Sequence, residues 1–190
     1  MMRTKLAGWK EHFTGVIVLS LALTTLISLP FLPARSASKL GLDALDTLHA
    51  KWALVFAGYP GCTTQCPLTL ANMAAAQRTI ASDDLQLVFI NTDRYGSSTQ
   101  STRYASLFHA SFVAISTTDI PPSDLMRKLG IQTFDDVSNQ PAHSGQVFLL
   151  KRAGTDWRID HVYRQTPDAS VLVDDLSKRM MMDQPLGAER

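Results

Sequence analysis

Short continuous apolar runs alternate along this chain with stretches in which apolar residues recur at helical spacing. Residues 52–57 form a continuous apolar run that ends at Gly58, as expected of a strand buried on both faces. Residues 67–80 follow with the pattern of an amphipathic helix, and residues 85–90 form a second apolar run. The pattern therefore predicts a strand, a helix and a second buried strand in this order.

The C-terminal half continues this alternation and adds a hairpin. Residues 146–150 and 157–163 are two β-rich runs on either side of a turn that contains Gly154, which predicts antiparallel pairing. Asp168 is placed to cap a last helix that runs to about residue 180. Less regular patterns predict a weak helix at 40–48, a polar loop at 91–99, a helix at 100–109, a short strand at 112–115, a helix that ends near 130 and a polar loop at 131–142.

The first 36 residues have the pattern of a membrane-targeting segment. Arg3, Lys5 and Lys10 precede a run without charges, in which residues 13–29 suit either a short spanning helix or a signal-peptide core. We expect residues 1–36 to be an anchor or signal segment and residues 37–190 to form one domain. An uncleaved anchor would hold that domain at the membrane on the extracytoplasmic, periplasmic side. Cleavage after Ser36 would release it as a secreted soluble protein.

Size and charge narrow the class of protein. The chain has 190 residues, of which 45% are hydrophobic, which is enough for one ordinary core. The formal net charge of +1 combines roughly +3 on residues 1–36 with roughly −2 on the remainder. Because the slightly acidic domain lacks the basic face that phosphate contacts need, we expect no nucleic-acid partner.

Both cysteines lie in the loop that follows the first predicted strand. Cys62 and Cys66 are four residues apart, so one helical turn would bring both sulfur atoms to the same face of the helix that begins near Pro67. A helix N-terminus stabilises a thiolate, which makes cysteine a better nucleophile and a better ligand for soft metals. Three residues separate the cysteines, whereas thioredoxin-type exchange enzymes have two, and the longer loop suits a metal ion. Two thiolates select Cu(I), and an added imidazole would also permit Cu(II).

A cysteine pair at a strand-to-helix junction, within this alternation of elements, predicts an α/β protein with a thioredoxin-like fold. We expect three layers with a central mixed sheet, preceded by the N-terminal membrane segment. In such a fold the loop that leads into the strand at 146–150 passes beside the cysteine loop, so His143 is the best placed third ligand. The other histidines have no metal-like spacing and are expected to be surface or hydrogen-bonded residues: His12, His49, His109 and His161.

Three stretches of the chain together resemble the Sco/SenC family. They are the cysteine loop at 58–67, Ile-Asn-Thr-Asp at 90–93, and His143 with Ser144 before a strand. Members of this family are copper-binding proteins with a thioredoxin-like fold, usually held to a membrane by one helix, that assist assembly of the dinuclear copper centre of cytochrome c oxidase. The resemblance implies copper as the cargo and the copper-binding oxidase subunit, or another copper protein, as the partner. It also implies Cys62 and Cys66 as thiolate ligands, His143 as the third ligand and Asp93 in a supporting or partner-facing position.

Two departures from the family pattern keep alternatives open. Thr63 and Thr64 stand where the family usually has proline and aspartate, and Ala142 stands where it often has aspartate. Both departures remove negative charge near the metal, which affects affinity, the Cu(II) state and partner recognition. The spacing of the cysteines and the resemblance to the family still favour a metallochaperone over an enzyme. The alternative is a thiol-disulfide oxidoreductase in which Cys62 attacks a partner disulfide and Cys66 resolves it. A peroxidase ranks third, because peroxide reduction needs polar groups arranged around one thiolate and the sequence assigns no such pattern. A purely structural disulfide between the two cysteines is the remaining interpretation.

Overall fold

The computed structural model describes residues 19–20, 43–93, 95–116, 127–131, 134–135, 141–142 and 145–183. The chain divides into two units, Met1–Ala37 and Ser38–Arg190. In the first unit only Leu19 and Ser20 are described, and both are helical. Among the described residues, no helix combines the length and the apolar character needed to cross a membrane. The rest of the segment predicted at 1–36 lies outside the described residues, so the membrane segment stays a prediction.

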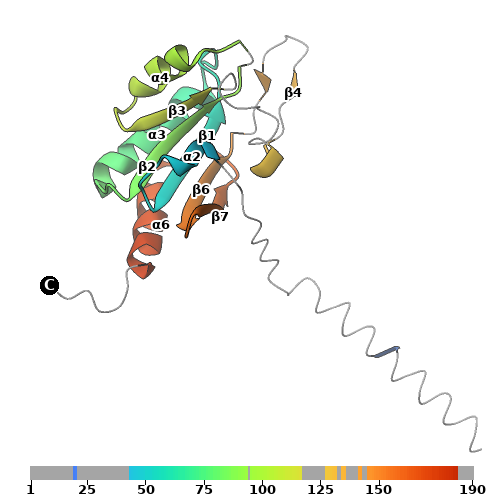
Figure 1. The fold of residues 1–190 in the computed structure, drawn as a ribbon, viewed down its shortest axis with the longest axis vertical. Coiled ribbons are helices and arrows are strands. Elements are labelled where there is room, and N and C mark those ends of the chain that lie inside the picture. Colours follow the sequence, from blue (N-terminus) through green and yellow to red (C-terminus); the bar gives the residue numbers. More distant parts are fainter. Residues whose placement is uncertain are drawn as a thin grey trace, which may run out of the picture. The chain divides into compact units, whose positions relative to one another are not determined.

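A mixed sheet of five strands forms the centre of the second unit (Figure 1). In spatial order the strands are β3 (Phe112–Ser116), β2 (Leu85–Asn91), β1 (Trp52–Gly58), β6 (Val147–Ala153) and β7 (Asp156–Tyr163). β1 pairs in parallel with β2, and β2 with β3, whereas β6 runs antiparallel to both β1 and β7. The predicted mixed sheet and C-terminal hairpin are therefore confirmed.

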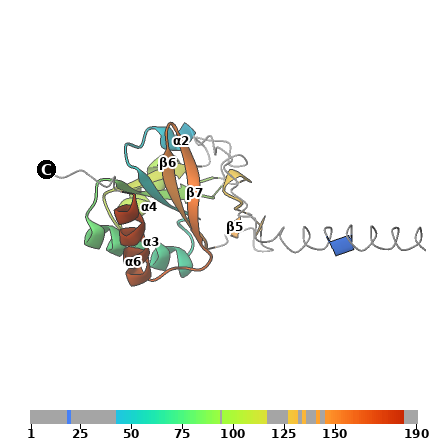
Figure 2. The ribbon, with the colours of Figure 1, turned by 90° about the horizontal axis from the view of Figure 1, so that it is seen from below.

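A hydrophobic core lies on each face of this sheet. The described helices of this unit include α2 (Asp43–Asp46), α3 (Gln65–Ile80), α4 (Ser98–Ser106) and α6 (Ala169–Met182). Residues of α3, α4 and α6 contribute to the first core, and Figure 2 shows α3 and α6 on the opposite side of the sheet from α2. The second core contains Leu45 and Leu48, from α2 and the segment after it, together with Leu129 and Ile131. The expected layering around a central sheet is thus present.

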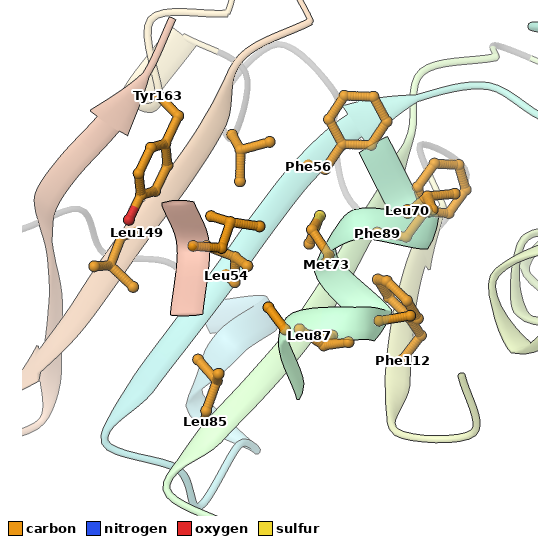
Figure 3. Packing of buried hydrophobic residues seen from close by; sticks show 14 of the residues in the cluster. Leu54, Phe56, Leu70, Met73, Leu85, Leu87, Phe89, Phe112, Leu149 and Tyr163 are labelled. Carbon is orange, nitrogen blue, oxygen red and sulfur yellow. The ribbon is translucent and has the colours of Figure 1, made fainter. Parts of the chain in front are cut away.

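Alternate side chains of the central strand β1 divide between the two cores. Leu54 and Phe56 belong to the core under α3, where they lie near Leu70 and Met73 (Figure 3), while Val55 belongs to the other core. All five side chains are fully buried. Burial of one such side chain contributes roughly 1.5–3 kcal/mol to the stability of the fold, so packing fixes β1 on both faces. The cysteine loop therefore starts from a rigid support.

Two local predictions differ from the structure. The helix predicted at 40–48 ends at Asp46 in its described part, and Leu48 and Ala50 in the segment after it are buried without helical structure. The polar loop predicted at 131–142 contains two short strands that pair antiparallel, β4 (Phe134–Asp135) and β5 (Pro141–Ala142). Strands of two residues are too short to produce an alternating pattern, so the sequence gives no signal for them.

Candidate metal centre

The cysteine loop joins the C-terminal end of β1 to the N-terminus of α3. The helix begins at Gln65, two residues before the start expected from Pro67, so Cys66 lies in its first turn. The backbone N–H of Cys66 donates a hydrogen bond to the Sγ of Cys62 at 3.3 Å. Thr64 occupies the N-cap position but makes no side-chain capping hydrogen bond. The Cys62 sulfur thus takes a place usually filled by a capping oxygen, where the helix dipole favours negative charge.

The two thiols are free and differ in their surroundings. Cys62 is half-buried and Cys66 is fully buried in the core under α3. Burial raises the pKa of the Cys66 thiol, and so does the hydrogen bond it donates to Cys62. Partial burial acts in the same direction on Cys62, but the hydrogen bonds from Cys66 and from the backbone of residues 64–66 outweigh it and lower its pKa. Cys62 is therefore the more readily ionised of the pair.

Gly58 allows the end of β1 to approach the buried cysteine. A Cβ atom on Gly58 would lie 2.7 Å from the Sγ of Cys66 and 2.9 Å from Cε1 of Phe56. The carbonyl oxygen of Gly58 accepts hydrogen bonds from the backbone N–H of Thr92 at 2.8 Å and from its hydroxyl at 3.3 Å. These bonds fix the loop after β2 beside the cysteine loop.

Asp93 lies in that second loop. Its backbone N–H donates to Oδ1 of Asn91 at 3.0 Å, and its own Oδ1 accepts the backbone N–H of Tyr95 at 2.9 Å. Its carbonyl oxygen accepts the N–H of Gly96 at 3.1 Å. The half-buried carboxylate therefore orders the backbone of its own loop. The supporting or partner-facing position expected for Asp93 stays a prediction.

His143 lies outside the described residues. Among the residues that are described, no group of three or more histidine, cysteine, aspartate or glutamate side chains is arranged to hold a metal ion. The structure thus brings together two of the predicted ligands, Cys62 and Cys66, and the third stays a prediction.

The family of the chain follows from a comparison that covers most of its length. The sequence model of the SCO1/SenC family matches residues 44–181. The chain belongs to the SCO1/SenC family. No curated protein sequence matches it.

Solved structures show the same fold at low identity. ScoI of Arabidopsis thaliana with copper bound is 21% identical, with a TM-score of 0.62 over 71% of this chain and 87% of that one. ScoI of Bradyrhizobium japonicum with copper bound is 20% identical, with a TM-score of 0.57 over 69% of this chain and 86% of that one. Yeast Sco1 is 20% identical, with a TM-score of 0.57 over 70% of this chain and 85% of that one. The second unit is therefore a thioredoxin-like α/β fold.

Sequence reasoning missed two residues beside the cysteine pair of this SCO1/SenC member. Gln65, between the cysteines, contacts Gly145, and the pattern of the loop gives no hint of that contact. Burial, and then the charges of Cys66 and Cys62, raise the pKa of Tyr104 on α4 to about 12. Tyr104 and Cys62 both pack against the core that contains Cys66. Its hydroxyl is buried and has no hydrogen-bond partner among the described residues. No signal in the sequence distinguishes Tyr104 from other tyrosines.

Among the other described histidines, His49 and His109 fit their expected roles, whereas His161 is half-buried beside a tyrosine. His109 shares a hydrogen bond with the hydroxyl of Ser111 at 2.8 Å between Nδ1 and Oγ. The ring of His161 packs edge-on against Tyr163, with 4.7 Å between the ring centroids. His49 is exposed. His12 lies outside the described residues.

Proposed function

We propose that the chain is an extracytoplasmic copper chaperone that binds one copper ion through Cys62, Cys66 and His143. The observation that carries the proposal is the pair of free thiols at the N-terminus of α3 in a member of the SCO1/SenC family. ScoI of Arabidopsis thaliana and ScoI of Bradyrhizobium japonicum, which share the fold, have been solved with copper bound. The copper is cargo, received from a donor and delivered to an acceptor.

The donor set of the cysteine loop suits copper. Two thiolates are soft ligands that select Cu(I), and an imidazole from His143 would extend binding to Cu(II). Because Cys62 is half-exposed and Cys66 is buried, an acceptor reaches the metal from the Cys62 side. Transfer would then proceed by ligand exchange, in which an acceptor ligand replaces Cys62 first. The acceptor that we propose is a copper-binding subunit of cytochrome c oxidase, met at the membrane that the N-terminal segment targets.

Thiol-disulfide exchange is the second candidate, and the asymmetry of the pair favours it. Cys62 combines partial exposure with a lowered pKa, whereas burial raises the pKa of Cys66. The Cys62 thiolate would attack a partner disulfide and form a mixed disulfide, releasing one partner thiolate. Cys66, after losing its proton, would attack the Cys62 sulfur and release the second partner thiol, which leaves the partner reduced and the pair oxidised.

Copper titration of the anaerobically reduced full-length chain tests the chaperone. We expect one copper per chain in the parent and none in the Cys62→Ala/Cys66→Ala double variant. His143→Ala removes a proposed ligand and should weaken Cu(II) binding by at least about 100-fold, the upper end of the range found when only a supporting partner of a ligand is lost. The matched control is His49→Ala, which changes an exposed histidine and should leave the affinities for Cu(I) and Cu(II) unchanged.

The same proteins separate the two candidates. If the parent binds no copper tightly and reduces a disulfide substrate as fast as His143→Ala does, the chaperone proposal is wrong and disulfide exchange takes its place.

A further inference from the structure

Two large apolar side chains are exposed near the edge of the sheet that carries the cysteine loop. Because β1 and β2 are parallel, the cysteine loop and the loop after β2 leave the sheet at this same edge. Tyr95, in the loop after β2, is 90% exposed, and Leu68, near the start of α3, is 56% exposed. Single exposed apolar side chains, such as Leu107 at the end of α4, are common and need no explanation. Tyr95 and Leu68 differ from Leu107 in their distance from the cysteine pair.

That distance is short enough for one interface to cover the cysteines and both side chains. The carbonyl oxygen of Gly58 accepts the backbone N–H of Thr92 at 2.8 Å, and Gly58 lies against Sγ of Cys66. Tyr95 follows Thr92 by three residues, a chain length of at most about 11 Å. Leu68 lies only about 3 Å along the helix axis from Cys66. An ordinary interface buries about 800 Å² on each partner, which corresponds to a patch of about 16 Å radius.

The loop that presents Tyr95 is ordered by its own hydrogen bonds. Oδ1 of Asp93 accepts the backbone N–H of Tyr95 at 2.9 Å, and the carbonyl oxygen of Asp93 accepts that of Gly96 at 3.1 Å. The hydroxyl of Ser116, at the end of β3, donates to the carbonyl oxygen of Gly96 at 2.6 Å. A residue on an ordered loop loses little backbone freedom when it binds. Tyrosine is also enriched among the residues that contribute most to protein interfaces.

The described surface around the cysteine pair carries little charge. Residues 58–68 contain no aspartate, glutamate, lysine or arginine. α3 has no charged residue before Arg78 in its last turn, although Leu68 and Ala71 on its outer face are exposed. The outer face of a surface helix is usually charged or polar. In the loop after β2 the described charged side chain is Asp93, which is half-buried and bound to its own backbone. Such a surface fits an apolar partner surface better than an array of opposite charges.

We propose that Tyr95 and Leu68 anchor the copper acceptor, a protein that docks over Cys62 with an uncharged, apolar surface around its own metal ligands. The inference rests on the copper transfer proposed above and adds the surface that recognises the acceptor. Cys62 is the more exposed thiol of the pair, so ligand exchange begins under this surface. An acceptor ligand forms its bond to copper as the bond from copper to the Cys62 sulfur breaks, and no electron is transferred.

Copper transfer from the full-length chain, loaded with Cu(I), to two different acceptors tests this proposal. The first acceptor is the copper-free copper-binding subunit of cytochrome c oxidase, which must dock. The second is bathocuproine disulfonate, a small Cu(I) chelator that needs no docking surface. Tyr95→Ala and Leu68→Ala remove the anchors. Tyr95→Phe, which keeps the ring, and Leu107→Ala, which changes an exposed leucine at the far end of α4, are the matched controls.

We expect Tyr95→Ala to slow second-order transfer to the oxidase subunit by about tenfold or more, which is about 1.4 kcal/mol of interface energy. Leu68→Ala should slow it by about threefold. Both variants should bind the same amount of copper as the parent and should lose it to the chelator at the parent's rate. Tyr95→Phe and Leu107→Ala should transfer copper to both acceptors as the parent does. Salt sufficient to screen surface charges should change the rate to the subunit by less than about threefold.

The outcomes separate this proposal from the one on which it rests. Tyr95→Ala that transfers copper to the subunit at the parent's rate would overturn the docking surface and leave the chaperone standing. Equal slowing toward the subunit and the chelator would also overturn it, because the copper site itself would then be disturbed. A steep fall of the parent's rate with salt would overturn the uncharged character of the contact. A parent that binds no copper, or delivers none to the subunit, would overturn both proposals.

Discussion

Tyr104 combines a well-packed ring with a hydroxyl that lacks a partner among the described residues. The ring centroid lies 5.5 Å from that of Phe89 and 5.5 Å from that of Phe108. Such aromatic contacts stabilise the fold. A buried hydroxyl without a hydrogen bond instead costs free energy, because it loses its contacts with water.

Replacing Tyr104 by phenylalanine therefore should not weaken the fold. We expect Tyr104→Phe to leave the free energy of unfolding unchanged or to raise it by up to about 1 kcal/mol. Tyr104→Ala, which also removes the ring, should lower it by about 3–5 kcal/mol. Urea unfolding of both variants measures these differences. A loss of more than about 1 kcal/mol in Tyr104→Phe would mean that the hydroxyl is hydrogen-bonded in solution.

α6 is attached to β7 by a small network of charged and polar groups. Tyr163 donates its hydroxyl proton to Oδ2 of Asp175 at 2.5 Å, and Nε of Arg179 donates to the same oxygen at 2.8 Å. Nη1 of Arg179 also contacts Asp160 on β7 at 2.5 Å. Partial burial of Asp175 acts to raise its pKa, but the hydrogen bonds from Arg179 and Tyr163 outweigh burial and lower it.

This lowered pKa makes the attachment of α6 sensitive to acid. Because Asp175 has a lower pKa folded than unfolded, its contribution is fully present above about pH 4 and is lost as the pH falls through the folded pKa. We expect the free energy of unfolding to fall less between pH 7 and pH 3 in Asp175→Asn than in the parent. Asp174→Asn, at the adjacent and more exposed aspartate, is the control. Equal falls in Asp175→Asn and the parent would show that Asp175 does not contribute.

The sheet is joined to the segment after the N-terminal unit by two side chains of the hairpin. The guanidinium of Arg152 lies 4.6 Å from the ring centroid of Trp157 and donates to the carbonyl oxygens of Leu48 and Ala50. Nε1 of Trp157 donates to the carbonyl oxygen of Leu45 at 3.2 Å. These bonds hold residues 45–50 over the core that contains Leu45, Leu48 and Trp157, and so fix the start of the described part of the second unit.

Removing Arg152 should therefore release this segment before the rest of the molecule unfolds. We expect Arg152→Ala to lower the free energy of unfolding by about 1.5–3 kcal/mol, as for hydrogen bonds that involve a charged group. Limited trypsin digestion should cut after Lys51 sooner in this variant. Arg158→Ala, at an exposed position of β7, should behave like the parent. Unchanged cleavage in Arg152→Ala would mean that Trp157 alone holds the segment.

Local patterns were sufficient for the sheet and for the cysteine pair. Seven consecutive buried residues in β1 explain the continuous apolar run, and the hairpin turn at Gly154, with a φ of +68°, was visible as a polar break. The start of α3 was missed by two residues because Pro67 is acceptable within a first turn, whose N–H groups lack helical partners. The contacts of Gln65 and Tyr104 join segments distant in the sequence, and single-sequence periodicity carries no information on such pairs.

The position of Gly145 has a consequence for biosynthesis. About 80 residues separate Cys66 from Gly145, which is roughly 4–16 s of synthesis at about 5–20 residues per second. During that interval the nascent chain already presents both thiols, while the segments that later enclose Gln65 have not been made. Both thiols are therefore synthesised before the segments that bury Cys66 are complete, and keeping the pair reduced during translation is a requirement separate from the stability of the finished fold.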